Sequence, residues 1–367
     1  MGCSHGRSEA QRAQPVESDH GNLNRPGRGG GVILTHACHA MGTRFEFLLV
    51  HADKHHALAT AEAAAQEVLR LHNLWSPFES SSVIAALNRE AHARPMRVDA
   101  DTFALLNFCK DIHTQSAGTF DITLGHRMRA HGFRGGTVLA SCPPSQREGE
   151  GGGLSSSTSV PLFGSHHIHL DPATHSVLFT ANIALDLGAV AKGWALDAAA
   201  TILREARITS ALLHAGTSSV LAIGQQPDSS PWRVRVSPDP DAPVVDLSNN
   251  ALSVSAPHGR VLLPPLPEGG GGGWADARAQ NPQLTPDLHS CATDLASIPP
   301  HLSHTIDPRT GQPTAPLLHA AVIAPNAALA DAWSTALLVD GKLPPTVSGV
   351  TALTQSRDGL WSLPTNR

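Results

Sequence analysis

One stretch constrains the fold of this chain more than any other: a short apolar run that breaks at a glycine and leads into an amphipathic helix. The run spans Ile183 to Leu187, Gly188 lets the backbone turn, and Lys192-Gly193 follows. The apolar residues beyond it recur at the spacing of one helix face: Leu196, Ala199, Leu203 and Ala206. The pattern predicts a strand end followed by a helix that begins near Lys192.

The start of this predicted helix is a favourable place for a phosphate or another anion. The first N–H groups of a helix have no partner within it, and they carry the positive end of the helix dipole. Lys192 adds a positive charge beside them. The spacing Gly-x-x-x-Lys-Gly is not a Walker loop, so a tight turn with a solvated lysine remains the alternative at this stage.

Composition limits the other possibilities. The chain has 367 residues, 41% of them hydrophobic, which is enough for a large core in one large or two ordinary domains. A formal net charge of -5 leaves no basic excess for a nucleic-acid backbone. Tyrosine is absent, so stacking on a flavin would need Phe or Trp. The five cysteines are scattered without a Cys-x-x-Cys pair, which predicts reduced thiols and no zinc site.

Membrane association is not indicated by the sequence. No stretch approaches the roughly 18 apolar residues of a membrane span. The first residues, Met-Gly-Cys-Ser-His-Gly, lack the apolar region of a signal peptide. We therefore expect a cytoplasmic protein, or a periplasmic or membrane-anchored one if the true start lies elsewhere.

Three segments have the composition of disordered chain. Residues 1–31 are rich in Gly, Arg, Ser and Gln, and residues 141–164 are rich in Pro, Gly, Glu and Ser. Residues 264–300 contain the run Gly269 to Gly273. We expect a disordered tail over 1–31 and one domain over 32–367 with disordered insertions at about 141–164 and 264–300.

The remaining sequence alternates between helix and strand patterns. Helices are expected at His56 to Leu74, Ala100 to Thr114 and Ala328 to Leu338, besides the one after Lys192. Strands are expected at Val32 to Cys38, Arg44 to Val50, Ser210 to Leu213, Ser219 to Ile223, Trp232 to Val236, Ala251 to Ser255 and Ala320 to Ile323, with a hairpin over 167–180 that turns at Asp171-Pro172. Such a mixture predicts an α+β fold with mostly antiparallel sheets.

Six short segments carry a resemblance to a known family. In chain order they are Met41-Gly42-Thr43, Phe78 to Asn88, Gly118 to Gly125, Asp186 to Asp197, His304 to Gly311 and Ala330 to Thr335. Together they resemble the FAD:protein FMN transferases (ApbE-type, once called thiamine-biosynthesis lipoproteins). The resemblance runs from about Val32 to the C-terminus, apart from the two insertions. It implies a two-lobed flavin-transferase-like fold with mixed, mostly antiparallel sheets and packed helices.

The resemblance also implies an activity. In that family FAD binds in a cleft between two lobes with Mg²⁺ on its pyrophosphate, FMN passes to a Thr or Ser hydroxyl of an acceptor flavoprotein, and AMP leaves. The positions that match FAD-contacting residues are Met41, Phe78, Thr119, Phe120, Asp121, Asp186, Lys192 and Ile306. Phe78 stands where the family has a stacking Tyr, and it keeps the aromatic face without the hydroxyl. The alternative for Phe78 is a core residue just after Pro77.

The metal ligands implied by the resemblance are the backbone carbonyl of Ala189, the carboxylate of Asp331 and the hydroxyl of Thr335. The spacing of Asp331 and Thr335 supports this independently, because residues i and i+4 share one helix face. Mg²⁺ is usually held by a few protein oxygens together with phosphate and water. The alternative is an Asp that only complements a helix dipole.

His304 is the expected catalytic base, because it matches the family's His before Ile-Asp-Pro-x-Thr-Gly and imidazole accepts a proton near neutral pH. Asp307 is the second candidate for the proton relay. The chain has 22 histidines, so composition alone does not single out His304. Two other groups could imitate a metal cluster: His55-His56, and His166, His167 and His169.

The chain departs from the family in three loops. Gly216-Thr217-Ser218 replaces the usual Gly-Gly-Asp, and Val254-Ser255-Ala256 replaces Thr-Ser-Gly. The Pro and Trp that usually follow Thr-x-Gly are missing around His126 to Phe133. Two alternatives to FMN transfer therefore remain: an FAD pyrophosphatase that yields FMN and AMP, and a non-catalytic FAD-binding protein.

Overall fold

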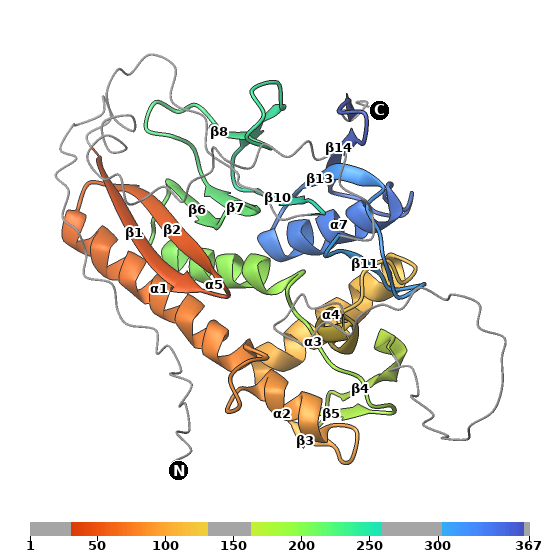
Figure 1. The fold of residues 1–367 in the computed structure, drawn as a ribbon. Coiled ribbons are helices and arrows are strands. Elements are labelled where there is room, and N and C mark those ends of the chain that lie inside the picture. The colour runs from red at the N-terminus through yellow and green to blue at the C-terminus, as the bar shows by residue number, and fades with distance from the viewer. Residues whose placement is uncertain (1–30, 131–162, 258–302, 363–367) are drawn as a thin grey trace, which may run out of the picture.

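The computed structural model describes residues 31–130, 163–257 and 303–362 (Figure 1). All of the expected tail over 1–31 except Gly31, nearly all of the insertion at 141–164 and the whole of that at 264–300 lie outside these ranges. The three described ranges contain every residue that we expect in the functional site.

The centre of the fold is an eight-stranded antiparallel sheet in the order β1-β2-β6-β7-β10-β13-β14-β15. Its strands are β1 (Val32–Ala40), β2 (Thr43–His51), β6 (Ala211–Ala215), β7 (Ser219–Ile223), β10 (Ala251–Ser255), β13 (Leu317–Ala324), β14 (Thr351–Ser356) and β15 (Trp361–Ser362). Phe45, Phe47 and Leu49 alternate along β2 and are fully buried, as expected for one apolar face of a strand.

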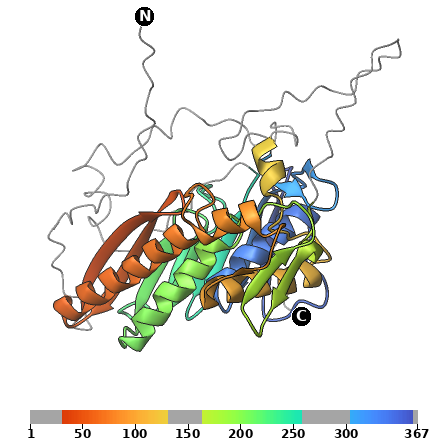
Figure 2. The same ribbon diagram turned by 90° about the horizontal axis from the view of Figure 1, so that it is seen from below.

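Three helices cover one face of this sheet: α1 (Lys54–Trp75), α5 (Ala191–Glu205) and α7 (Ala327–Asp340). Figure 2 shows α1 and α5 lying side by side along the sheet. The hairpin of β8 (Trp232–Arg235) and β9 (Val244–Leu247) covers the other face. Leu221 of β7 accordingly packs in the main core with the helices, while Val220 packs with the hairpin.

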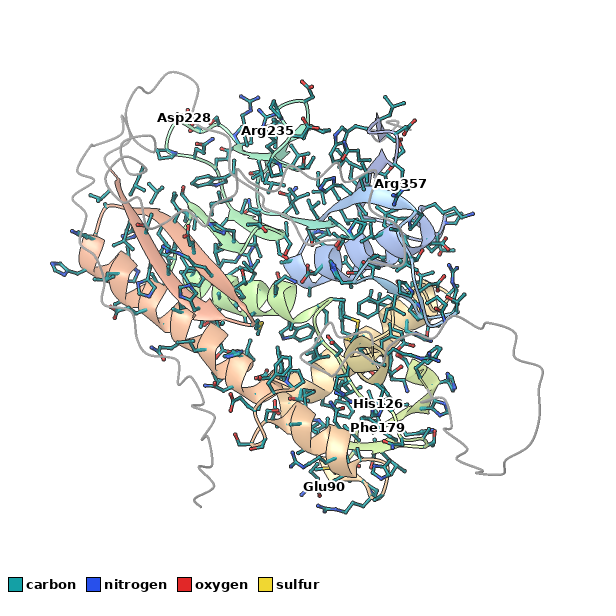
Figure 3. All side chains as sticks on the ribbon, in the orientation of Figure 1. Glu90, His126, Phe179, Asp228, Arg235 and Arg357 are labelled. Atoms are coloured by element: carbon teal, nitrogen blue, oxygen red, sulfur yellow. The ribbon has the colours of Figure 1, made fainter. Side chains whose placement is uncertain are left out.

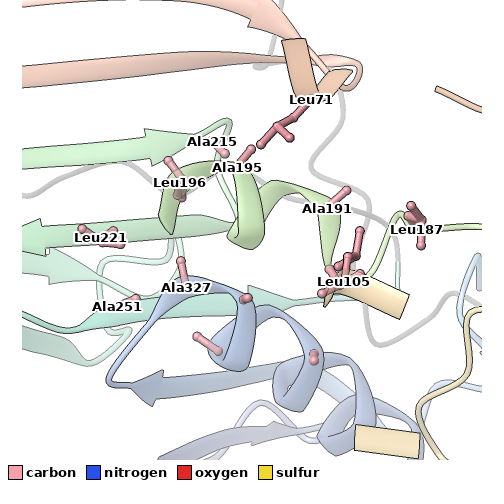
Figure 4. Packing of buried hydrophobic residues seen from close by; sticks show 14 of the residues in the cluster. Leu71, Leu105, Leu187, Ala191, Ala195, Leu196, Ala215, Leu221, Ala251 and Ala327 are labelled. Carbon is pink, nitrogen blue, oxygen red and sulfur yellow. The ribbon is translucent and has the colours of Figure 1, made fainter. Parts of the chain in front are cut away.

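The helices α5 and α7 approach each other unusually closely at Gly193. A Cβ added to Gly193 would lie 2.2 Å from the carbonyl oxygen of Ala327, so a side chain there would push the helices apart. Figure 4 shows Ala195 and Leu196 of α5 between Leu71 of α1 and Ala327 of α7. The small residues of this layer therefore set the spacing of the helices that carry the expected site.

A second group of elements packs against the helix ends. It contains α2 (Val83–Glu90), α3 (Ala100–Gln115), α4 (Gly125–Ala130), the 3-10 helix η1 (Ser165–His167) and the sheet β3 (Met96–Arg97)-β5 (Ser176–Phe179)-β4 (Ile168–Asp171). The chain returns through a small hairpin, β11 (Ile306–Asp307) and β12 (Gln312–Pro313). Figure 3 shows Glu90 and Phe179 on the same side of this group, where Phe179 N–H donates to the carbonyl of Ala91 at 2.8 Å.

The α+β class and the antiparallel sheets are confirmed, and so is the hairpin over 167–180, which appears as β4 and β5. The strand end expected at Ile183 to Leu187 is wrong. This segment forms only an isolated bridge between Leu124 and Ala184. Its backbone is held instead by individual bonds, since Leu185 N–H donates to the Asn88 side chain at 2.7 Å and Asp186 N–H donates to the carbonyl of Ile122 at 2.7 Å.

Several short elements were not predicted from the sequence, among them α2, β9 and β14. Within the described ranges, no helix combines the length and the apolar character that crossing a membrane needs. Cys38 and Cys109 are free thiols, and the other three cysteines lie outside the described residues.

Candidate functional site

The start of α5 lies beside a buried carboxylate from α7. The N-cap residue of α5, Val190, makes no side-chain cap hydrogen bond. Gly193 N–H donates to Oδ2 of Asp331 at 3.0 Å instead, and Nζ of Lys192 lies 3.5 Å from the same oxygen. Asp331 is only 3% exposed. The predicted helix start therefore already binds an anionic group, the side chain of Asp331.

Two serines hold the other oxygen of Asp331. Ser219 of β7 and Ser253 of β10 donate to Oδ1 at 2.9 and 2.7 Å, and these two serines are direct partners across the paired strands. Hydrogen bonds to an ionised carboxylate are strong, and together they fix its orientation. Asp331 is thus presented in one orientation by groups from α5, β7 and β10.

Other oxygen donors surround this carboxylate. The hydroxyl of Thr335 lies one helical turn further along α7, donates to the carbonyl of Asp331 at 3.2 Å and lies 3.4 Å from the Ser255 hydroxyl. Ala189 lies in the turn before α5, where Lys192 Nζ donates to the carbonyl of Gly188 at 3.2 Å. The side-chain atoms that could bind a metal ion are hard oxygens, including those of one carboxylate. Such a set fits Mg²⁺ that is also bound by phosphate oxygens.

The histidine groups do not form a rival metal site. Among the residues that the structure describes, no three His, Cys, Asp or Glu side chains are arranged to hold a metal ion. His166 and His167 lie against each other with ring centroids 4.1 Å apart, and His56 binds the carbonyl of Ala206.

The residues expected to contact the flavin lie at one end of α1. Met41 occupies the turn between β1 and β2 with φ of 52°, and its N–H donates to Nδ1 of His72 in the last turn of α1 at 3.2 Å. Phe78 follows the end of α1 by three residues and is 67% exposed. That exposure contradicts the alternative of a core residue at this position.

The end of α1 meets the start of α5. Trp75 is the last residue of α1, and its ring lies edge-on to that of Trp194, with centroids 6.5 Å apart. Phe108 of α3 contacts Trp194 in the same way at 5.7 Å. Because Trp194 follows Lys192 by two residues, this aromatic contact joins the end of α1 to the cluster around Asp331.

The segment from Thr119 to Asp121 is held by its own side chains. Phe120 is 1% exposed and belongs to the main core. Asp121 accepts from Thr123 N–H and from the Thr123 hydroxyl, both at 2.7 Å, and from Ser165 N–H at 3.0 Å. Nδ1 of His113 lies 3.1 Å from Oδ2 of Asp121. The side chains of Phe120 and Asp121 thus anchor the segment, and its backbone is held as well, because Phe120 N–H donates to the Ser116 hydroxyl at 3.1 Å.

The pair of His113 and Asp121 predicts a pH dependence of stability. Its hydrogen bond with Asp121 raises the pKa of His113. Burial raises the pKa of Asp121, but bonds from His113 and Thr123 outweigh it and hold that pKa below its usual value. A raised His pKa gives stability that is lost at high pH, and a lowered Asp pKa gives stability that is lost at low pH. The pair therefore contributes most between about pH 4 and pH 6.5.

We expect His113→Leu to lower the free energy of unfolding more at about pH 5.5 than at about pH 8.5. Urea denaturation of the parent and the variant at both pH values measures this difference. Equal destabilisation at both pH values would show that the charged pair does not form.

His304 and Asp307 lie on the segment that returns after residues 258–302. His304 N–H donates to the carbonyl of Pro257 at 3.1 Å, so the two described ends meet there. Ile306 is buried and pairs with Pro313. Asp307 is bound by Arg309 through Nε at 3.0 Å and Nη2 at 2.9 Å, and Arg309 also reaches Asp340 at 2.7 Å.

Asp307 is the weaker candidate for a proton acceptor. Burial raises its pKa, but the hydrogen bonds from Arg309 outweigh burial and hold the pKa below its usual value. A carboxylate with a lowered pKa and a bound guanidinium is a poor base. His304 is half-buried, and it remains the first candidate because imidazole in general accepts a proton near neutral pH.

Sequence reasoning missed Ser219 and Ser253. Serines at buried positions in apolar strands were the available signal, because a buried hydroxyl needs a partner. The sequence gives no indication that both serines face one carboxylate 78 or more positions further along the chain.

Fold and site together define an α+β protein in which a lysine and a buried carboxylate with neighbouring hydroxyls suit a phosphate-bearing ligand with a divalent cation. The model of the ApbE family matches residues 41–270 and 298–345. The chain belongs to the ApbE family.

Individual relatives agree with this assignment. A Rhodobacter capsulatus protein named FAD:protein FMN transferase is 30% identical over 292 residues, which is 78% of this chain and 47% of the relative. This chain thus spans about half of that relative's length. A Klebsiella pneumoniae protein of the same name is 24% identical over 310 residues, 82% of this chain and 77% of the relative.

Solved structures show the same fold. The ApbE protein of Thermotoga maritima superimposes with a TM-score of 0.69 at 22% identity, covering 90% of this chain and 97% of that one. The apo form of the Pseudomonas stutzeri flavinyl transferase ApbE gives 0.66 at 20% identity, covering 92% and 96%. At these identities the likeness establishes the fold alone.

Proposed function

We propose that this chain transfers FMN from FAD to a Thr or Ser hydroxyl of an acceptor flavoprotein, in a Mg²⁺-dependent reaction that releases AMP. One observation carries the proposal: Lys192 and the buried, serine-held Asp331 meet at the start of α5, next to the end of α1 that presents Met41 and Phe78. The relatives named FAD:protein FMN transferase support the same activity.

The residues around Asp331 suit the pyrophosphate. Ala189 through its carbonyl, Asp331 and Thr335 would hold Mg²⁺, which when bound neutralises phosphate charge and stabilises the leaving AMP. Ser219 and Ser253 occupy Oδ1 of Asp331, so Oδ2 is the oxygen that faces Lys192. Lys192 would then pair with a phosphate oxygen as a mobile point charge.

The remaining residues would hold the flavin and move the proton. Phe78 offers an exposed aromatic face to the isoalloxazine ring, Met41 contacts the flavin beside it, and Asp186 and Ile306 contact other parts of FAD. The acceptor hydroxyl oxygen bonds to the FMN-side phosphorus while the phosphorus–oxygen bond to AMP breaks. His304 takes the hydroxyl proton, and AMP leaves with the bonding electrons.

Product analysis tests the proposal against its alternatives. The protein is incubated with FAD, Mg²⁺ and a Thr-bearing acceptor, and the products are read by mass and flavin fluorescence. FMN joined to the acceptor with release of AMP supports the proposal. Free FMN with AMP would instead show a pyrophosphatase, and bound, unchanged FAD would show a non-catalytic FAD-binding protein; either result overturns the proposal.

Phe78 gives a prediction on FAD affinity. We expect Phe78→Ala to weaken FAD binding by roughly tenfold, because a stacked aromatic face is worth about 1 kcal/mol or more. Phe78→Tyr should bind FAD at least as tightly as the parent. Since Phe78 is 67% exposed, both variants should melt close to the parent temperature. Flavin titration and thermal melting measure the two effects.

Leu360→Ala is the matched control for Phe78, because Leu360 is also an exposed large apolar residue, at 68%. It should leave FAD affinity unchanged. Unchanged affinity in Phe78→Ala together with a large fall in melting temperature would exclude stacking by Phe78.

A further inference from the structure

Asp197 makes a contact that the proposed reaction does not explain. It lies on α5, one turn after Gly193, and its two carboxylate oxygens accept from the first two residues of α7. Ala327 N–H donates to Oδ1 and Ala328 N–H donates to Oδ2, both at 2.8 Å. These N–H groups have no partner within α7, because the first turn of a helix leaves its donors unpaired. Asp197 therefore caps a helix other than its own.

A second cap runs in the opposite direction. Asp331 of α7 accepts from Gly193 N–H in the first turn of α5 at 3.0 Å. Val190, the N-cap residue of α5, supplies no side-chain cap of its own. Each helix thus provides the aspartate that satisfies a donor at the start of the other, and the two bonds tie the helix starts together.

The close approach at Gly193 makes this connection rigid. A Cβ on Gly193 would lie 2.2 Å from the carbonyl oxygen of Ala327 and 2.8 Å from Cα of Ala328. The backbones are therefore in direct contact at the point where both caps form. Lys192 belongs to α5 and Asp331 to α7, so any sliding of one helix along the other changes the 3.5 Å between them.

The start of α7 does not depend on Asp197 alone. Asn326, its own N-cap residue, accepts from Leu329 N–H at 2.8 Å. The local cap of α7 and the cap from α5 are thus separate bonds to separate donors. The first stabilises the helix end, and the second in addition fixes where α7 lies against α5.

We propose that Asp197 is a positioning residue, which by capping α7 from α5 fixes the separation of Lys192 and Asp331 in the site for the metal and the pyrophosphate. This inference rests on the function proposed above. It predicts that losing the Asp197 cap weakens metal and FAD binding in a protein that is still folded. Partners that orient a metal ligand are commonly worth 10- to 100-fold in metal affinity.

The test compares Asp197→Ala, Asp197→Asn and the control Asn326→Ala. Mn²⁺ binding is measured by electron paramagnetic resonance and FAD binding by flavin fluorescence, at a temperature where circular dichroism shows each variant folded. Burial raises the pKa of Asp197 to about 6, against the lowering effect of the bonds from Ala327 and Ala328, so the measurements are made near pH 8 with the carboxylate ionised. The Asn side chain keeps an oxygen that accepts one N–H bond.

We expect Asp197→Ala to weaken Mn²⁺ and FAD binding about tenfold and Asp197→Asn about threefold. Asn326→Ala should lower the melting temperature while leaving both affinities within twofold. If Asp197→Ala does not fold, the comparison of Asp197→Asn with Asn326→Ala decides in the same way.

Parental affinities in folded Asp197 variants would overturn the inference, and so would equal losses in the Asn326 control. If the parent protein binds Mn²⁺ and FAD and the Asp197 variants bind them equally well, only the role proposed for Asp197 is refuted. A parent that binds neither ligand defeats the proposed function and this inference with it.

Discussion

Asp331→Asn is expected to lower Mg²⁺-dependent FMN transfer by at least about 100-fold while the protein stays folded. Asp331 is the one anionic side chain among the proposed metal ligands, and the amide cannot neutralise a cation. The amide has the shape of the carboxylate and can keep its hydrogen bonds. Its oxygen can accept from Gly193 N–H, and the hydroxyls of Ser219 and Ser253 can rotate to accept from its NH₂ group. Initial rates of acceptor labelling against Mg²⁺ concentration measure the loss.

The choice of Asn over Ala follows from the burial of Asp331. Asp331→Ala leaves the donors on Gly193, Ser219 and Ser253 without their acceptor, and each unsatisfied buried donor costs about 1–3 kcal/mol. We expect Thr335→Ala to cost much less activity than Asp331→Asn, since water can replace a neutral hydroxyl ligand. Asp246→Asn, an exposed carboxylate of β9, is the control for loss of charge. Full activity in Asp331→Asn would refute the metal assignment.

His304→Ala is expected to slow FMN transfer by about 10²- to 10⁴-fold without a comparable loss of FAD affinity. His304 is proposed to accept the hydroxyl proton only as the new bond forms, so its removal acts on kcat and not on binding. Single-turnover labelling of the acceptor, together with FAD titration, separates the two effects.

Two variants serve as comparisons for His304. Asp307→Asn should have a smaller effect, because Arg309 already holds that carboxylate with a lowered pKa. His92→Ala, at an exposed histidine, should have none. The assignment fails if His304→Ala keeps the parental rate, or if Asp307→Asn is the slower of the two.

The sequence predicted those parts of the fold that depend on local patterns. The alternation of Phe45, Phe47 and Leu49 located β2, and the helical spacing of Leu196, Ala199 and Leu203 located α5. Likewise, the i, i+4 spacing placed Asp331 and Thr335 on one helix, and the structure has both on α7. In each case the interaction that shapes the element is encoded within a few residues.

What the sequence did not predict depends on bonds between distant segments. Leu185 belongs to none of the sheets, and its N–H is bound by the side chain of Asn88 instead of a neighbouring strand. The carboxylate of Asp121 is occupied by His113, Thr123 and Ser165, although its motif indicated a nucleotide contact. A bond between a side chain and a remote backbone group has no periodicity, so no pattern along the chain reveals it.

The most direct test of the proposed function is whether a metal ion at Asp331 contacts the pyrophosphate of bound FAD. Phosphorus NMR of the protein with FAD can show this when Mn²⁺ replaces Mg²⁺, since a paramagnetic ion in contact with the phosphates broadens their resonances. We expect strong broadening of both FAD phosphorus signals in the parent protein and its loss in Asp331→Asn, with FAD still bound at saturating concentration. Equal broadening in the parent and in Asp331→Asn, or none in the parent with FAD bound, would refute the metal site at Asp331.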